Sequence, residues 1–205
     1  MVISRLDESI ALEGAGLLSD LPEGSTFTEY CERLQSLEDD LKTLPSGQEH
    51  SRRYEEIVGQ VIQLCFFRSL CNVQPRERDI NGCVVRDWIA ANRASSGLWE
   101  MIRVRYQATQ IIWECKNYRD LKSDDFSQIT YYLTKETGYF GVLCFRGEST
   151  KHYFEHVKRI SSEKNALVLL ISDRDLQVFL RQAKNGKLKE DHIQELYDRT
   201  VRSIG

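Results

Sequence analysis

The stretch Ile111-Ile112-Trp113-Glu114-Cys115-Lys116-Asn117-Tyr118 (IIWECKNY) begins as an apolar strand and ends in charged and polar residues. Side chains of an extended chain alternate between the two faces of a sheet, so Glu114 and Lys116 lie on one face together with Ile112. Trp113 and Cys115 face the other way. The segment therefore predicts a buried strand that presents a carboxylate and an ammonium group side by side at its end.

Apolar and amphipathic segments alternate after this strand. Nearly continuous apolar runs predict two further strands, and helical spacing of apolar residues predicts four helices. The expected strands are 139–145 and 166–172, and the expected helices are 123–138, 150–162, 173–184 and 189–203. Because a strand, a helix and a second strand normally form a right-handed crossover, these strands should pair in parallel.

A β-hairpin is expected before the strand. Asn81-Gly82 is a favoured dipeptide for a tight type I′ turn, and it separates two strand-like segments, 72–80 and 83–91. Helices are expected at 51–70 and 97–106, and the strand that carries Glu114 at 109–115. The predicted fold class is α/β, with a mixed β-sheet (an antiparallel hairpin plus parallel strands) flanked by helices on both faces.

The first 45 residues differ in charge from the rest of the chain. They contain ten acidic and three basic residues, a charge of −7, which leaves +4 for the remainder of a chain with net charge −3. Helical spacing predicts one or two short helices here, of which the segment from Thr26 to Leu44 fits best. We expect an acidic helical N-terminal appendage at 1–45 and a main domain at 46–205. The appendage either covers part of the domain, or binds a partner or shields a cleft from DNA.

The composition, 205 residues of which 41% are hydrophobic, suits an ordinary domain with a substantial core. No run of about 18 apolar residues exists, and the N-terminus lacks the features of a secretion signal, so a cytoplasmic protein without a membrane segment is predicted. The six cysteines have no paired spacing and are expected to be buried free thiols. His152 and His156 are expected on a solvated helix face.

A second carboxylate is expected beside Glu114. Strand alternation places Asp87 on an apolar face, where an uncompensated charge would cost several kcal/mol. One compensating partner is Arg76, which the hairpin places opposite Asp87 as a cross-strand ion pair. The other is a divalent metal that Asp87 shares with Glu114. Asp79 is a competing acid, but it lies beside the hairpin turn, farther from the expected metal.

The metal interpretation explains more of this pattern. Mg²⁺ prefers oxygen ligands and is usually held by one or two carboxylates together with waters and substrate phosphates. Asp87, Glu114 and the backbone carbonyl of Cys115 supply such ligands for Mg²⁺ or Mn²⁺. Lys116, on the same face as Glu114, would orient the attacking water and stabilise charge that develops on phosphorus.

Asp87, followed by Glu114-Cys115-Lys116 at the end of an apolar strand, resembles the PD-(D/E)XK nuclease superfamily, which has the restriction-endonuclease-like fold. The resemblance covers roughly residues 47 to 145, although the proline that commonly precedes the first acid is missing. It implies that Glu55, in the helix before the hairpin, contacts the metal or its water. The neighbouring Glu56 is a rival for this role, more simply explained as a solvated residue.

Gln128 and Tyr132 form a Q-x-x-x-Y pattern in the next helix and share one of its faces. This pattern resembles a subset of the superfamily that is linked to recombination exonucleases. In that subset the glutamine braces catalytic groups and the tyrosine approaches the nucleic acid, whereas core packing is the other interpretation of Tyr132. Arg119 and Lys122 are candidate phosphate contacts, or else ordinary surface charges.

The resemblance implies a Mg²⁺-dependent deoxyribonuclease, a hydrolase that cuts phosphodiester bonds in DNA. Nucleases of this fold act in restriction, phage defence or repair, and a small nuclease calls for gating by a protein partner, an activator or homodimer formation. The alternative is a catalytically inactive nuclease-fold module that binds nucleic acid or a partner protein. The joint presence of Asp87, Glu114 and Lys116 favours the enzyme.

Overall fold

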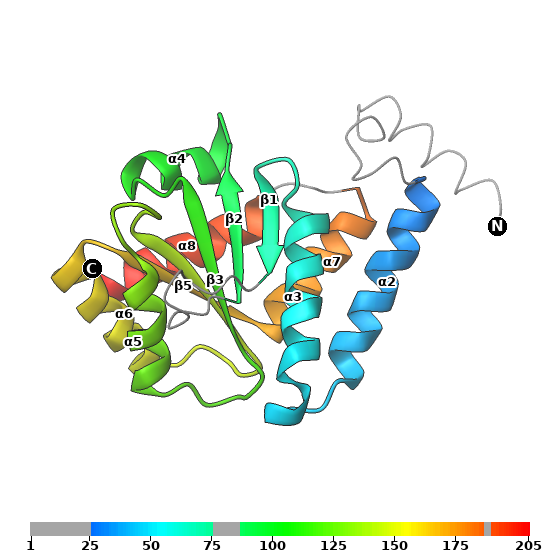
Figure 1. The fold of residues 1–205 in the computed structure, drawn as a ribbon, viewed down its shortest axis with the longest axis horizontal. Helices are drawn as coiled ribbons and strands as arrows, with labels where there is room; N and C mark the ends of the chain where they lie inside the picture. Colours follow the sequence, from blue (N-terminus) through cyan, green and yellow to red (C-terminus); the bar gives the residue numbers. More distant parts are fainter. Residues whose placement is uncertain (1–25, 76–86, 187–189) are drawn as a thin grey trace.

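A mixed five-stranded sheet forms the centre of the molecule (Figure 1). The structure, a computed structural model, describes residues 26–75, 87–186 and 190–205. The strand order is β1-β2-β3-β4-β5, with β1 (Leu70–Pro75), β2 (Trp88–Asn92), β3 (Gln110–Lys116), β4 (Phe140–Phe145) and β5 (Leu167–Ser172). The first three strands pair antiparallel, whereas β3, β4 and β5 are parallel. The predicted α/β class and mixed sheet are confirmed.

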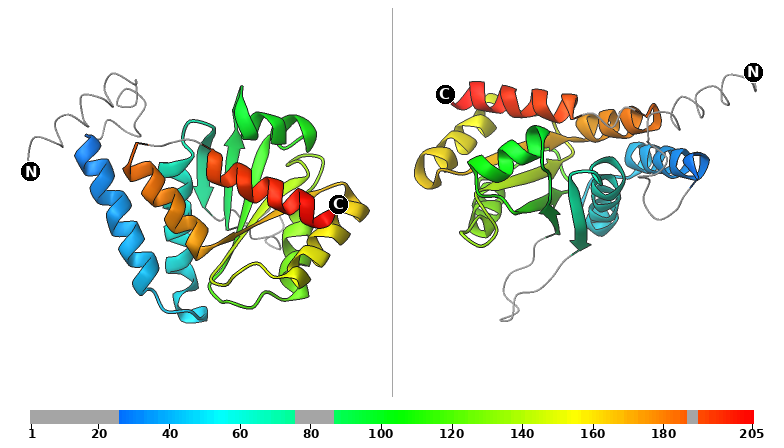
Figure 2. Two further views of the ribbon diagram at one scale, coloured as in Figure 1. Left: turned by 180° about the vertical axis from the view of Figure 1, so that it is seen from behind. Right: turned by 90° about the horizontal axis from the view of Figure 1, so that it is seen from above.

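Helices cover both faces of this sheet. They are α2 (Phe27–Thr43), α3 (Ser51–Cys65), α4 (Gly97–Arg105), α5 (Ser123–Tyr132), α6 (Lys151–Lys164), α7 (Asp173–Lys184) and α8 (Asp191–Ile204), with a short 3₁₀ turn at Gln48–His50. Helix α5 packs on the face of Glu114, because Gly141 of β4 lies on that face and directly against Ile129 of α5. Trp113, on the other face, contacts Trp99 of α4. Figure 2 shows α7 and α8 on one side of the sheet and α5 on the other.

Helix α3 ends at Cys65, five residues before the predicted limit of 70. The apolar pattern continues into Phe66, but the N–H groups of Ser69 and Leu70 both donate to the Phe66 carbonyl, at 2.9 and 2.8 Å. This turn stops the helix and directs Leu70 into β1. The prediction of a helix to residue 70 was wrong because pairing with β2 overrides the local pattern.

Helix α5 ends at Tyr132, so the predicted limit of 138 was also wrong. The hydroxyl of Thr137 donates to the Tyr132 carbonyl at 2.7 Å and satisfies one of the free acceptors of the last turn. Gly138 has a φ of 95°, and a Cβ atom there would lie 2.3 Å from Ala108 Cα. The chain therefore leaves the helix to pass closely over the residues before β3.

Strands β1 and β2 form the antiparallel pair that was predicted for the hairpin. Their register places Pro75 opposite Trp88. The predicted turn at 81–82 lies outside the described residues, as do Arg76 and Asp79. The ion pair between Arg76 and Asp87 and the competing role of Asp79 therefore stay predictions.

Gly59 allows helix α3 to lie directly on Trp88 of β2. A Cβ atom at Gly59 would come within 2.0 Å of the Trp88 ring, and the indole Nε1 donates to the Glu55 carbonyl at 2.7 Å. Helix α3 also packs against β1, β3 and α7. Because Trp88 directly follows Asp87, this contact sets the position of α3 relative to the start of β2.

Substitution Gly59→Ala is expected to destabilise the protein. In an unobstructed helix the change would stabilise by roughly 0.5–1 kcal/mol, but the overlap with Trp88 should cost about 1–3 kcal/mol and win. Thermal unfolding followed by circular dichroism should show a Tm lower by about 3–10 °C. Gly205→Ala, where the nearest atom to the new Cβ is 3.5 Å away, is the matched control. An unchanged or raised Tm for Gly59→Ala would contradict the close contact.

Helix α2 is the helical part of the predicted appendage, and it packs against α3 and α7. It starts as predicted, with the Thr26 side chain accepting the N–H of Glu29 in a reciprocal capping box. Its helical spacing in the sequence predicts an apolar stripe of Tyr30, Leu34, Leu37, Leu41 and Leu44. The first four are buried in the same core as the sheet, and Leu44 packs against that core partly buried. Residues 1–25 lie outside the described part of the chain.

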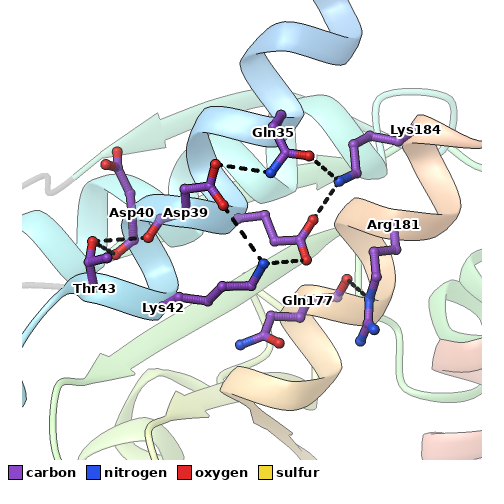
Figure 3. A network of polar contacts seen from close by, with 9 residues as sticks. Gln35, Asp39, Asp40, Lys42, Thr43, Gln177, Arg181 and Lys184 are labelled. Carbon is purple, nitrogen blue, oxygen red and sulfur yellow. Dashed lines mark hydrogen bonds and ion pairs between the residues drawn. The ribbon is translucent and has the colours of Figure 1, made fainter.

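A polar network fastens α2 to α7 (Figure 3). The Glu38 carboxylate is buried, and it pairs with Lys42 at 2.9 Å and with Lys184 of α7 at 2.5 Å. Lys184 also donates to Gln35 Oε1 at 2.7 Å. A buried carboxylate is stable only when it is paired. Lys42 pairs with Glu38 within α2, whereas Lys184 links α7 to both Glu38 and Gln35 of α2 and so holds the two helices together.

None of the described helices has the length and apolar character that crossing a bilayer requires. The five described cysteines are free thiols, as predicted: Cys31, Cys65, Cys71, Cys115 and Cys144. Only the last two are fully buried, and Cys83 lies outside the described residues. His152 lies exposed on α6 with its ring Nε2 3.3 Å from that of His156.

Candidate active site

Four side chains selected from the sequence form one hydrogen-bonded chain at the end of β3. Lys116 Nζ lies 2.8 Å from Glu114 Oε1 and 2.8 Å from Gln128 Oε1. Gln128 Nε2 in turn lies 3.3 Å from the hydroxyl of Tyr132. Strand alternation accounts for the first contact, and the four-residue spacing in α5 accounts for the last.

Asp87 joins this group from the residue before β2. Its Oδ2 accepts a hydrogen bond of 2.8 Å from the N–H of Cys115, the residue between Glu114 and Lys116. Asp87 is 5% exposed. The Cys115 thiol is buried in the core, as expected, while its main chain lies beside Asp87. Two acidic side chains from neighbouring strands thus share a space with little water.

Glu114 is a buried carboxylate with one unsatisfied oxygen. The residue is 1% exposed, and its Oε2 has no hydrogen-bond partner within the described chain. Burial, and after it the charge of Asp87, raise the pKa of Glu114 to about 8, although Lys116 opposes the shift. An unpaired buried oxygen costs free energy. A cation beside Oε2 would remove this cost.

Lys116 is held among acidic groups. Burial lowers its pKa, but the hydrogen-bonded carboxylate of Glu114, and then Asp125 and Asp87, outweigh burial, so the pKa of Lys116 lies above its ordinary value. Its side chain is 13% exposed. Lys116 therefore carries a proton at neutral pH, and it acts as a hydrogen-bond donor and a positive charge rather than as a base.

The two neighbouring acids of α3 lie in different surroundings. Glu55 is half-buried, and its charge contributes to the raised pKa of Glu114. Glu56 instead forms ion pairs with Arg53 at 3.2 Å and with Arg52 at 3.5 Å. Of this pair, Glu55 is the acid that acts electrostatically on Glu114.

Asp125 and Tyr118 were not selected from the sequence. The Tyr118 hydroxyl donates to Asp125 Oδ1 at 2.5 Å, and this oxygen lies 3.7 Å from Lys116 Nζ. Asp125 Oδ2 accepts the N–H of Lys122 at 2.7 Å, so the same side chain caps α5. Its spacing of three residues from Gln128 places both on one helix face, and this was the signal available in the sequence.

The predicted nucleic-acid contacts differ in exposure. Arg119 and Lys122 lie exposed on the connection between β3 and α5. Tyr132 is 6% exposed, and its hydroxyl is directed at Gln128. In this arrangement Tyr132 contacts the catalytic candidates, while Arg119 and Lys122 face solvent.

The donor set suits a hard divalent cation. No group of three or more His, Cys, Asp or Glu side chains within residues 26–75, 87–186 and 190–205 is placed to hold a metal ion. Mg²⁺ needs fewer protein ligands, because it keeps several waters and takes one or two carboxylates. Asp87 and the unpaired oxygen of Glu114 would supply these, and a divalent charge would relieve their repulsion.

A cavity of about 370 Å³ lies at the opposite end of these strands. Arg93, which follows β2, and Ser69, which precedes β1, contribute to its lining. Glu190 reaches into it, accepting hydrogen bonds from Ser69 Oγ at 2.7 Å and from the N–H of Leu98 at 2.9 Å. The cavity is separate from the carboxylates, since Asp87 and Glu114 lie at the other ends of β2 and β3.

Most of the chain is similar to part of a larger bacterial protein. Over 157 residues the chain is 23% identical to a protein of Escherichia coli (strain K12) described as the transposon gamma-delta 80.3 kDa protein. The aligned part is 75% of this chain but 22% of the relative, so the chain spans about a fifth of that protein's length. No family model matches the chain, and no solved structure gives a significant match.

Proposed function

We propose that this chain is a metal-dependent nuclease that hydrolyses phosphodiester bonds in DNA. The observation that carries the proposal is the unpaired, buried oxygen of Glu114 next to Asp87, with the Lys116 ammonium 2.8 Å from the other oxygen. Packing alone gives no reason to bury two repelling carboxylates. A site for a divalent cation and a phosphate gives one.

We also propose that the fold is restriction-endonuclease-like. The contacts of Asp87, Glu114, Lys116, Gln128 and Tyr132 agree with the superfamily resemblance seen in the sequence. The similarity to a protein named for a transposon is consistent with DNA as the substrate. Restriction, phage defence or repair in the cytoplasm, with gating by a partner, an activator or a second copy, belongs to the same proposal.

Each side chain of the site has its own role in the proposed cleavage. Asp87 and Glu114 hold Mg²⁺ or Mn²⁺, which when bound neutralises phosphate oxygens and lowers the pKa of water. Lys116, protonated because of its raised pKa, donates hydrogen bonds that orient the attacking water and stabilise negative charge on the phosphoryl group. Gln128 holds Lys116 in place. Glu55, a half-buried carboxylate whose charge acts on Glu114, accepts the proton of the attacking water.

A second candidate function is an inactive nuclease-fold module that binds nucleic acid or a protein. One observation favours it: Asp87 and Glu114 are only 5% and 1% exposed, so substrate reaches them only after a rearrangement of the surrounding side chains. Such a module would bind its partner without metal-dependent cleavage.

Incubation of the purified full chain with linear and circular DNA tests the proposed function. With Mg²⁺ or Mn²⁺, strand breaks should accumulate, and EDTA should stop them. Glu55→Gln should slow cleavage by about 10²-fold or more, as expected for loss of a general base. Glu56→Gln, which alters the adjacent acid of the same helix, should leave the rate within about twofold, because Glu56 pairs with arginines. Equal loss in both variants, or cleavage that persists in EDTA, would contradict the assignment.

A further inference from the structure

One large aromatic side chain beside the candidate active site faces solvent. Tyr131 of α5 is 66% exposed, and in the described part of the chain Val104 of α4 is the other large apolar side chain of comparable exposure, at 69%. A single exposed apolar side chain is common on a protein surface, so the meaning of this exposure depends on what lies around Tyr131.

The position of Tyr131 connects it to the site. Its ring packs edge-on against that of Tyr132, with centroids 6.0 Å apart and an interplanar angle of 76°. Tyr132 contacts Gln128, and Gln128 contacts Lys116. Residues three apart share a helix face, so Tyr131 lies on the same side of α5 as Gln128. The exposed ring thus stands at the outer end of a continuous series of contacts that begins at Lys116.

An exposed cation lies near the end of helix α5. The ammonium group of Lys164, at the end of α6, donates to the carbonyl of Thr130 at 3.3 Å, one residue from Tyr131. Lys164 is exposed. Proteins bind single strands with aromatic rings on which bases stack and with cations that contact the phosphates. Tyr131 and Lys164 supply one group of each kind near the end of α5.

We propose that an unpaired base of the substrate strand stacks on Tyr131, so that the site acts on single-stranded DNA or on a duplex with an unpaired end. This inference rests on the proposed nuclease function and specifies its substrate class. Bases inside a duplex are already stacked and paired, and they cannot cover a protruding ring without first leaving the helix. A stacking site outside the carboxylates therefore selects strands whose bases are free.

The test measures binding separately from cleavage. The full chain is mixed with a fluorescent single-stranded oligonucleotide that carries one 2-aminopurine, or with the matching duplex, in Ca²⁺ in place of Mg²⁺. Tyr131→Ala should weaken single-strand binding by about 5- to 100-fold, the range expected for loss of one stacked base. Tyr131→Phe should stay within about twofold of wild type because the ring is kept. Duplex affinity should be unchanged.

Two controls make the outcomes separable. Val104→Ala removes the other exposed apolar side chain and should leave binding unchanged, and equal Tm values show that the variants are folded. Single-strand binding by Tyr131→Ala at the wild-type level, or an equal loss for single strand and duplex, overturns the stacking proposal. If single-strand binding depends on Tyr131 but Asp87→Asn and Glu114→Gln leave Mn²⁺ binding unchanged, the nuclease proposal fails while the stacking site stands.

Discussion

Substitution Lys116→Met is expected to abolish most of the proposed cleavage activity while leaving metal binding intact. The ammonium stabilises charge that develops on the phosphoryl group, and removing one such group from a buried site typically costs about 10²–10³ in rate. Metal affinity should be equal or higher, because Lys116 lies 2.8 Å from Glu114 Oε1 and competes with a cation for that carboxylate. Cleavage rates under saturating Mn²⁺, together with calorimetric titration of Mn²⁺, measure the two effects separately.

The matched control for this variant is Lys158→Met, which removes an exposed lysine of α6. It should leave both the rate and the metal affinity unchanged. A Lys116→Met protein that cuts DNA within about tenfold of the wild-type rate would remove Lys116 from the proposed mechanism. Loss of metal binding in this variant would assign Lys116 a structural role instead.

Substitution Glu114→Gln is expected to eliminate cleavage and, at alkaline pH, to stabilise the metal-free protein. The pKa of Glu114 is about 8 in the folded protein against an ordinary value of 4.5, so the folded state binds the proton more tightly than the unfolded state. The free energy of unfolding of the wild type should therefore fall as pH rises from about 4.5 to about 8, and then level off. Glutamine keeps the shape of the side chain and carries no charge, so the variant should not show this pH-dependent loss of stability.

Thermal unfolding in EDTA between pH 5 and pH 9 measures this difference. At pH 9 the free energy of unfolding of Glu114→Gln should exceed that of the wild type by roughly 2–4 kcal/mol, which corresponds to a Tm higher by about 5–15 °C. This difference in stability should shrink toward pH 5. Addition of Mg²⁺ should raise the Tm of the wild type but not of the variant. A gap that is constant with pH, or a variant that is less stable than wild type at pH 9, would show that Glu114 is ionised without penalty.

The start of a helix was predictable where the sequence carries an N-terminal capping signal. Helix α2 starts after Thr26, whose capping box with Glu29 is visible in the sequence, and α7 starts after Ser172 in the same way. The end of α3 was not predictable, because the apolar pattern runs on through Phe66 and only the pairing of Leu70 with β2 ends the helix. The local sequence pattern therefore predicts that a helix exists, but it does not predict where tertiary contacts end that helix.

Some contacts of the candidate site were likewise predictable from residue spacing, and others depend on the tertiary structure. The contact of Glu114 with Lys116 follows from strand alternation, and that of Gln128 with Tyr132 follows from helix geometry. The hydrogen bond of Tyr118 to Asp125 depends on the conformation of the loop between β3 and α5. A loop has no regular residue spacing from which such a contact could be predicted. Burial of Glu114 to 1% exposure depends likewise on how α5 lies over the sheet.

The central claim is that Asp87 and Glu114 together hold one divalent cation. Isothermal titration of the full chain with Mn²⁺ at pH 8 tests it most directly, because it requires neither DNA nor an activator. Wild type should bind, Glu56→Gln should bind equally, and both Asp87→Asn and Glu114→Gln should weaken binding by at least tenfold. Binding that survives in Asp87→Asn and Glu114→Gln, or a wild-type protein that takes up no cation, would contradict the account.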